Sequence, residues 1–256
     1  MLTRSLVGMP HLSTFVNGGT ISGVGVLVSG WAVWHRRATW RVPHDRALTL
    51  AVIFCAMTLF FCSPAQYNYV DSYFFHVTGI DHVAGFLGHL SSLAAFSTCI
   101  YAAVSRLVPD EEIEPVMRQA EYPVVFASLM LLIALTNSGA LRRQSHADMM
   151  EVPRDIWLTF YWVVYLLIVV YLAGFLIRLL LVLRTDPRSR TVATLLAAGA
   201  ALGIVALAAC GWDMVHPIPL WIIWATGGSS GIMWSLAAYW SVRLRFHRTE
   251  REEWGG

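Results

Sequence analysis

The stretch GIDHVAGFLGHLSSLAAF places Asp81, His82 and His89 at the mouth of an apolar run and inside it. The histidines are seven positions apart, which is two helical turns, so they share a face with Gly85 and Ser92. His89 then lies roughly 10 Å below the mouth of the run. A histidine at that depth can relay protons, bind a cation or hydrogen-bond a neighbouring helix. Ordinary interhelical hydrogen bonding is the competing interpretation.

A second polar group lies near the end of a later apolar run, in CGWDMVHPIP, where Asp213 and His216 precede a proline-rich turn. These two residues can form an outward-facing vestibule with the acidic and histidine residues before the first stretch and at its start, namely Asp71, His76, Asp81 and His82. Such a vestibule would attract cations and respond to pH. Ordinary loop polarity explains the same residues. No diagnostic metal-ligand spacing is present, so we predict no metal site.

The segment ATGGSSGIM contains the G-x-x-x-G pair Gly227 and Gly231, and an earlier run contains the pair Gly199 and Gly203. Small residues at this spacing let helices pack closely in a membrane. The alternative is a broken helix whose freed carbonyl groups bind an ion or solute, as in many transporters.

An unmade backbone hydrogen bond in lipid costs several kcal/mol, which favours an intact helix at this segment. We therefore expect its glycine face to pack against the helix at 83–105 or the helix at 192–212. Ser229 or Ser230 should hydrogen-bond across that contact, and Gly227→Leu should disrupt folding.

The composition indicates that lipid surrounds much of the chain. Of 256 residues, 57% are hydrophobic and only 13% are charged, with a mean hydropathy of +0.58. Soluble domains carry roughly 25% charged residues. Seven apolar runs are candidate membrane spans, at about 12–34, 47–62, 83–105, 122–137, 156–178, 192–212 and 219–242. We predict an all-α transmembrane bundle of seven helices that forms one domain over residues 1–256.

Arginine placement orients this bundle. All 18 basic residues are arginine, and the segments after the first, third and fifth spans, with the C-terminal tail, hold 14 of them. The opposite side holds Arg4, Arg142, Arg143 and Arg154. The positive-inside rule then predicts an outer N-terminus and an inner C-terminus. In this interpretation the acidic run PDEEIEP is a solvated inner loop.

Aromatic residues support the same orientation. They gather at the expected outer ends of two helices, where tryptophan and tyrosine commonly mark the membrane interface. These residues are Trp157, Tyr161, Trp162, Tyr165, Trp221 and Trp224.

Several kinds of chemistry are excluded by the residues. No lysine is present for a retinal Schiff base, and no H-E-x-x-H, G-x-S-x-G or Walker motif occurs. The four cysteines lack a C-x-x-C pair and are interpreted as packing residues. His89 is the only deep histidine, which argues against a pair of haem ligands. We therefore expect no enzymatic activity, no cofactor and no nucleic-acid partner.

The stretch PAQYNYVDSYFFHVTGIDHVAGFLGHLSSLAAF resembles a pattern in a family of actinobacterial multi-pass membrane proteins. Family members read Pro, then Tyr and Asp, then T-G-V-P-N-L, with a histidine seven residues after the Asn. Here Pro64, Asp71, Thr78, Gly79 and His89 follow that order, while Asp81 and His82 replace the usual Pro-Asn. The family is catalogued as transporters of unknown function, so the resemblance implies a multi-pass protein of the bacterial cytoplasmic membrane.

From these residues we predict passage or sensing of a small solute or cation through a polar centre near His89. The alternative is a membrane protein that does not transport but docks a partner, in signalling or phage-related defence. Membrane lipid is the one partner that the composition implies. A protein partner and a homo-oligomer both stay open.

Overall fold

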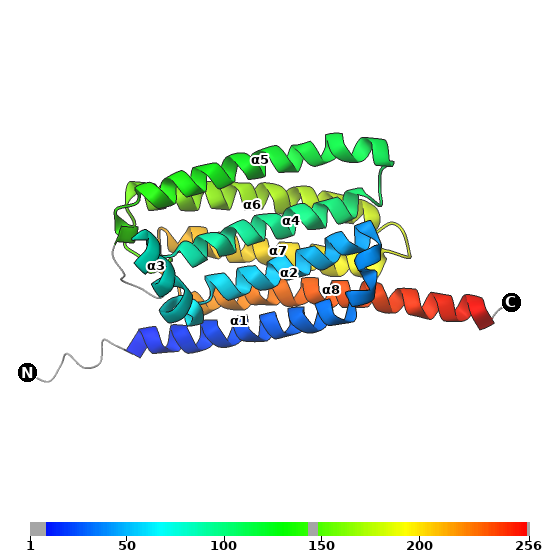
Figure 1. Cartoon of the computed structure of the whole chain (residues 1–256), viewed down its shortest axis with the longest axis horizontal. Helices are drawn as coiled ribbons and strands as arrows, with labels where there is room; N and C mark the ends of the chain where they lie inside the picture. The colour runs from blue at the N-terminus through cyan, green and yellow to red at the C-terminus, as the bar shows by residue number, and fades with distance from the viewer. Residues whose placement is uncertain (1–8, 143–147, 255–256) are drawn as a thin grey trace, which may run out of the picture.

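The apolar runs of the sequence form long α-helices that lie side by side, as a computed structural model describing residues 9–142 and 148–254 shows (Figure 1). The long helices are α1 (Met9–His35), α2 (Pro43–Cys62), α4 (Val83–Val104), α5 (Asp110–Asn137), α6 (Ile156–Leu183), α7 (Arg190–Asp213) and α8 (Leu220–Trp254). A short helix, α3 (Ser72–Thr78), follows a π-helical turn, η3 (Tyr67–Asp71), between α2 and α4. The all-α class is therefore confirmed.

The long helices run alternately in opposite directions, so the two chain termini lie at opposite ends of the bundle (Figure 1). We call the end near the N-terminus the N-side and the end near the C-terminus the C-side. The turns that connect α2 to α4 and α7 to α8 lie at the N-side. The arginine-rich segments after α1, α4 and α6 lie together at the C-side. Arg4 and Arg143 lie outside the described residues.

Five of these helices, α2, α4, α5, α6 and α7, are long and apolar enough to cross a membrane in the described part of the chain. Most helix ends lie within a few residues of the sequence prediction, and α3 was not predicted. The two largest differences are the start of α5, at Asp110 rather than near residue 122, and the end of α8, at Trp254 rather than near residue 242. Part of the run PDEEIEP is therefore helical, because Asp110, Glu111 and Glu112 in the first turn interact favourably with the helix dipole.

Helix α8 is α-helical without interruption from Leu220 to Trp254, so the broken-helix alternative is wrong. It packs against α7, where the Ser230 hydroxyl donates to the Gly199 carbonyl at 2.7 Å. This is the expected contact with the predicted helix at 192–212.

The glycines with the closest contacts in this packing are Gly199 and Gly228, whereas the contact expected from the sequence was at Gly227. A Cβ atom on Gly199 would lie 2.3 Å from Trp234 Cδ1, and one on Gly228 would lie 2.4 Å from Ile21 Cγ2. At Gly227 the nearest such atom is Ala206 Cβ, at 4.0 Å. Gly227 therefore borders open space, and the prediction that Gly227→Leu disrupts folding needs correction.

At the C-side, the fully buried side chain of Arg36 connects three helices through hydrogen bonds. Its guanidinium group joins the end of α1 to α2 and α8. The acceptors are Thr49 Oγ1 at 2.8 Å, the Ala238 carbonyl at 2.7 Å, the Asp45 carbonyl at 2.8 Å and the Ser241 hydroxyl. The Asp45 carboxylate lies 3.9 Å from Arg36 and 3.5 Å from Arg106. We call these residues the Arg36 cluster.

Candidate functional site

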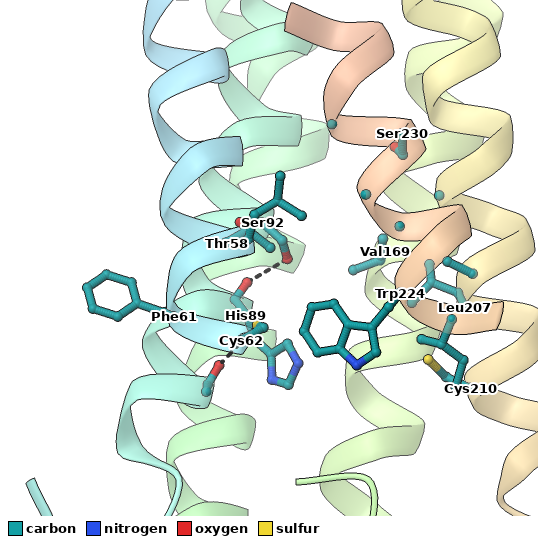
Figure 2. A pocket seen from close by; sticks show the side chains of 18 of the residues that line it. Thr58, Phe61, Cys62, His89, Ser92, Val169, Leu207, Cys210, Trp224 and Ser230 are labelled. Atoms are coloured by element: carbon teal, nitrogen blue, oxygen red, sulfur yellow. Dashed lines mark hydrogen bonds between the residues drawn. The ribbon is translucent and has the colours of Figure 1, made fainter. Parts of the chain in front are cut away.

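A cavity of about 210 Å³ lies inside the bundle, among α2, α4, α6, α7 and α8. Each helix contributes side chains to its wall, including Cys62 from α2, His89 from α4, Cys210 from α7 and Trp224 from α8. Figure 2 shows His89 and Trp224 pointing toward each other across this space, whereas the ring of Phe61 points away from it. A cavity of about 150 Å³ can hold benzene. The space is therefore large enough for a small solute.

His89 faces the interior of the bundle, as the sequence predicted, and is only 7% exposed. Its Nδ1 atom lies 2.7 Å from the hydroxyl of Tyr161, and its ring lies 4.1 Å from that of Tyr165, centroid to centroid. The Tyr165 hydroxyl is in turn 2.9 Å from Ser92 Oγ. His89 thus has an interhelical hydrogen bond and also lines the cavity.

The aromatic residues of α6 do not form the interfacial belt that the sequence indicated. Tyr161, Trp162 and Tyr165 are buried and pack around His89, while Trp157 is exposed. Packing of α6 turns this aromatic face toward α4. The positions of the aromatic residues in the sequence do not show which way the face points. On α8, likewise, Trp221 is exposed and Trp224 turns inward.

The N-side end of the cavity wall contains Asp71, which is almost fully buried. Asp71 accepts hydrogen bonds from Gln66 Nε2 at 2.9 Å and from the Ala84 backbone N–H at 2.7 Å. The second bond caps the first turn of α4 from a distant segment. Burial raises the Asp71 pKa to about 6, and the negative charge of Asp81 adds to that rise, while the hydrogen bonds from Gln66 and Ala84 oppose it.

His82 begins α4 in a left-handed backbone conformation, with φ of 58°. Such a conformation in a residue other than glycine costs on the order of 1–3 kcal/mol and is concentrated at functional sites. His82 Nδ1 lies 4.0 Å from Asp71 Oδ2, and His82 Nε2 lies 3.7 Å from Asp81 Oδ2. The Tyr67 hydroxyl donates to Asp81 at 3.0 Å. The structure therefore brings Asp71, Asp81 and His82 together as the sequence proposed.

The other members of the expected vestibule lie elsewhere. Asp213 forms an ion pair with Arg154, with 3.0 Å between Nη2 and Oδ2. His76 and His216 are exposed. On α8, Ser230 lines the cavity, but Ser229 is exposed and does not.

Sequence reasoning missed Asp148, a buried residue in the loop before α6 that lines the cavity. Its carboxyl group accepts hydrogen bonds from the Met150 backbone N–H at 2.9 Å and from Trp224 Nε1 at 3.1 Å. Burial raises the Asp148 pKa to about 6, and the nearby Glu151 and Asp213 contribute in the same direction, against the two hydrogen bonds. No local pattern marks this aspartate, because it reaches the cavity only through the folding of its loop.

The cavity wall also contains polar atoms without a hydrogen-bond partner among the described residues. They are Gln66 Oε1, Trp162 Nε1 and Trp234 Nε1. All three side chains are more than nine-tenths buried. Buried polar groups in folded proteins are nearly always paired, so these three atoms are exceptions within the wall of the cavity.

In the described part of the chain, no group of three or more histidine, cysteine or acidic residues could hold a metal ion. Comparison of the chain with protein-family models, with curated proteins and with solved structures finds no match. The functional argument therefore comes from the geometry of the cavity.

Proposed function

We propose that this chain is an integral membrane protein of the bacterial cytoplasmic membrane that binds a small solute in the cavity beside His89, as a transporter or a sensor. The proposal has seven spans, with the N-side outside. Helix α1 has 27 residues, a length of about 40 Å, and packs beside the five apolar helices together with α8. The arginine-rich ends at the C-side support an inner position for that end.

The observation that carries the proposal is a cavity with polar walls inside an otherwise apolar bundle. Polar groups at membrane depth are costly, and they commonly mark solute or ion pathways. Here His89 and Ser92 on α4 and Ser230 on α8 line one space.

Thiol labelling tests whether the cavity opens to the outer solution. Cys62 lines the cavity, and Cys99 is buried in the helix core away from it. A variant that keeps only Cys62 should react with a membrane-impermeant maleimide added to right-side-out vesicles. The same reagent should react much more slowly when it reaches the C-side in inverted vesicles.

The matched control keeps only Cys99, with alanine at the other three positions. This thiol should stay unlabelled in the folded protein and react after denaturation. Equal labelling of the two variants in intact vesicles, or labelling of Cys62 from the C-side alone, would contradict the proposed cavity and its orientation.

A further inference from the structure

The cavity wall contains acidic side chains but no arginine or lysine among its described residues. Two carboxyl groups, Asp71 and Asp148, line the cavity, and no arginine is among its described lining residues. The chain contains no lysine. The nearby Arg154 is directed to Asp213 through an ion pair. The wall also contains the rings of His82 and His89, and His82 Nδ1 lies 4.0 Å from Asp71 Oδ2.

Both aspartates line the cavity, and hydrogen bonds from neighbours fix both carboxyl groups in position. Asp71 is held by Gln66 and by the backbone at the start of α4. Asp148 is held by its own loop and by Trp224. Gln66 uses its amide nitrogen to donate to Asp71, so its unpartnered carbonyl oxygen adds another acceptor to the wall.

The remaining wall is aromatic. Indole rings of Trp162, Trp224 and Trp234 and the phenol of Tyr165 line the space from α6 and α8. The Trp224 ring is oriented by its hydrogen bond to Asp148, which places an aromatic ring next to a carboxyl group. Aromatic faces attract organic cations, and tryptophan does so most strongly.

We propose that the cavity binds a small organic cation, an amine or a quaternary ammonium compound, with its charge beside Asp71 and Asp148 and its apolar part against the indole rings. A neutral apolar solute would gain the aromatic contacts alone. An inorganic cation would need several oxygen ligands around one point, which this wall does not present among its described residues. The inference rests on the proposed function of this cavity as a solute site.

A pair of probes of equal shape tests the charge requirement. Choline and 3,3-dimethylbutan-1-ol differ in having nitrogen or carbon at the branched centre, so only choline is charged. Titration of purified full-length protein, followed by tryptophan fluorescence and calorimetry, should show binding of choline. The neutral isostere should bind at least about tenfold more weakly, which corresponds to about 1.4 kcal/mol. This comparison needs no variant, so it does not depend on folding of a mutant.

Substitution then locates the charge. Asp148→Asn keeps the shape of the side chain and should weaken choline binding about tenfold or more, with little change for the isostere. Glu114→Gln is the control, because Glu114 is an exposed carboxylate paired with Arg118 on α5 and does not line the cavity. It should leave both affinities unchanged.

The outcomes separate this inference from the proposal on which it rests. Equal binding of choline and its isostere, or binding of neither, would overturn the cation inference. If Cys62 is nevertheless labelled from outside, the solute cavity stands and only its ligand class is wrong. Unlabelled Cys62 would overturn the cavity itself.

Discussion

The two ends of the bundle bury polar groups in opposite ways. At the C-side, Arg36 is fully buried and its guanidinium group donates to acceptors on α2 and α8 around it. At the N-side, Asp71 and Asp148 are nearly as buried but border open space, together with indole and amide atoms that lack partners. The guanidinium group of Arg36 thus has acceptors around it, whereas the cavity wall retains polar atoms without partners among the described residues.

This difference separates structural from functional polarity in a membrane bundle. A buried charge with every hydrogen bond made holds helices in one arrangement, and removal of a partner leaves the others unsatisfied. Buried polar groups around a cavity stabilise little by themselves, because they hydrogen-bond fully only when something occupies the space. Changes in the Arg36 cluster should therefore reduce stability, and changes at the cavity should alter binding.

The largest expected effect is that of Arg36→Ala. This change leaves acceptors on α2 and α8 without a donor and removes one of the two arginines beside the Asp45 carboxylate, with Arg106 still 3.5 Å away. We expect a loss on the order of 3–5 kcal/mol in the free energy of unfolding, measured by denaturant titration in detergent. Arg37→Ala is the matched control, because Arg37 is exposed and contacts only the Trp34 ring among its described contacts. Arg37→Ala should change the free energy of unfolding by no more than about 0.5 kcal/mol. A similar loss of stability in both variants would contradict the structural role given to Arg36.

A pair of glycine substitutions gives the next largest effect. Leucine at Gly199 would clash with Trp234 and with the Ser230 backbone, so overpacking should lower stability by about 2–3 kcal/mol. Leucine at Gly227 has room, since only Ala206 lies near the added Cβ and the side chain extends into the cavity.

Gly227→Leu should therefore fold, with a melting temperature in detergent close to that of the unchanged protein, and should block labelling of Cys62. A fall in melting temperature as large as that of Gly199→Leu would show that the Gly227 face is packed and not open.

The smallest effect concerns pH. Burial raises the pKa of Asp71 and of Asp148 from 3.8 to about 6, so the folded state binds these protons more tightly than the unfolded chain does. Acidification from about pH 7.5 to about pH 5 should therefore stabilise the protein by on the order of 1 kcal/mol per carboxyl group. The titratable and charged groups around the two aspartates are His82, Asp81, Glu151, Asp213, Cys62 and Cys210.

The double variant Asp71→Asn/Asp148→Asn isolates this contribution from those neighbours. It should be more stable than the unchanged protein at about pH 7.5, and the difference in melting temperature should shrink as the pH falls. A difference that is constant with pH would show that the two carboxyl groups are not the source.

The amino-acid sequence by itself determined the helical class and the position of most helices. Hydrophobic runs of about 20 residues leave few alternatives in lipid, because each backbone polar group must find its partner within the helix. The inward direction of His89 was also predictable, since its ring nitrogens need partners that lipid does not supply. The glycine-rich stretch of α8 was correctly expected to stay helical for the same reason.

Tertiary structure alone decided which polar residues meet. Asp148 and Trp224 are 76 positions apart in the chain, and no periodicity connects them. Tyr161 and Trp162 had the composition of an interfacial belt, yet the packing of α6 on α4 turns them toward His89. Arg36 was one arginine among several in a polar segment, and only the crossing of α1, α2 and α8 buries it. Hydrophobicity sets the depth of a helix in the membrane, but the rotation of each helix against its neighbours follows from side-chain packing, which depends on the whole bundle.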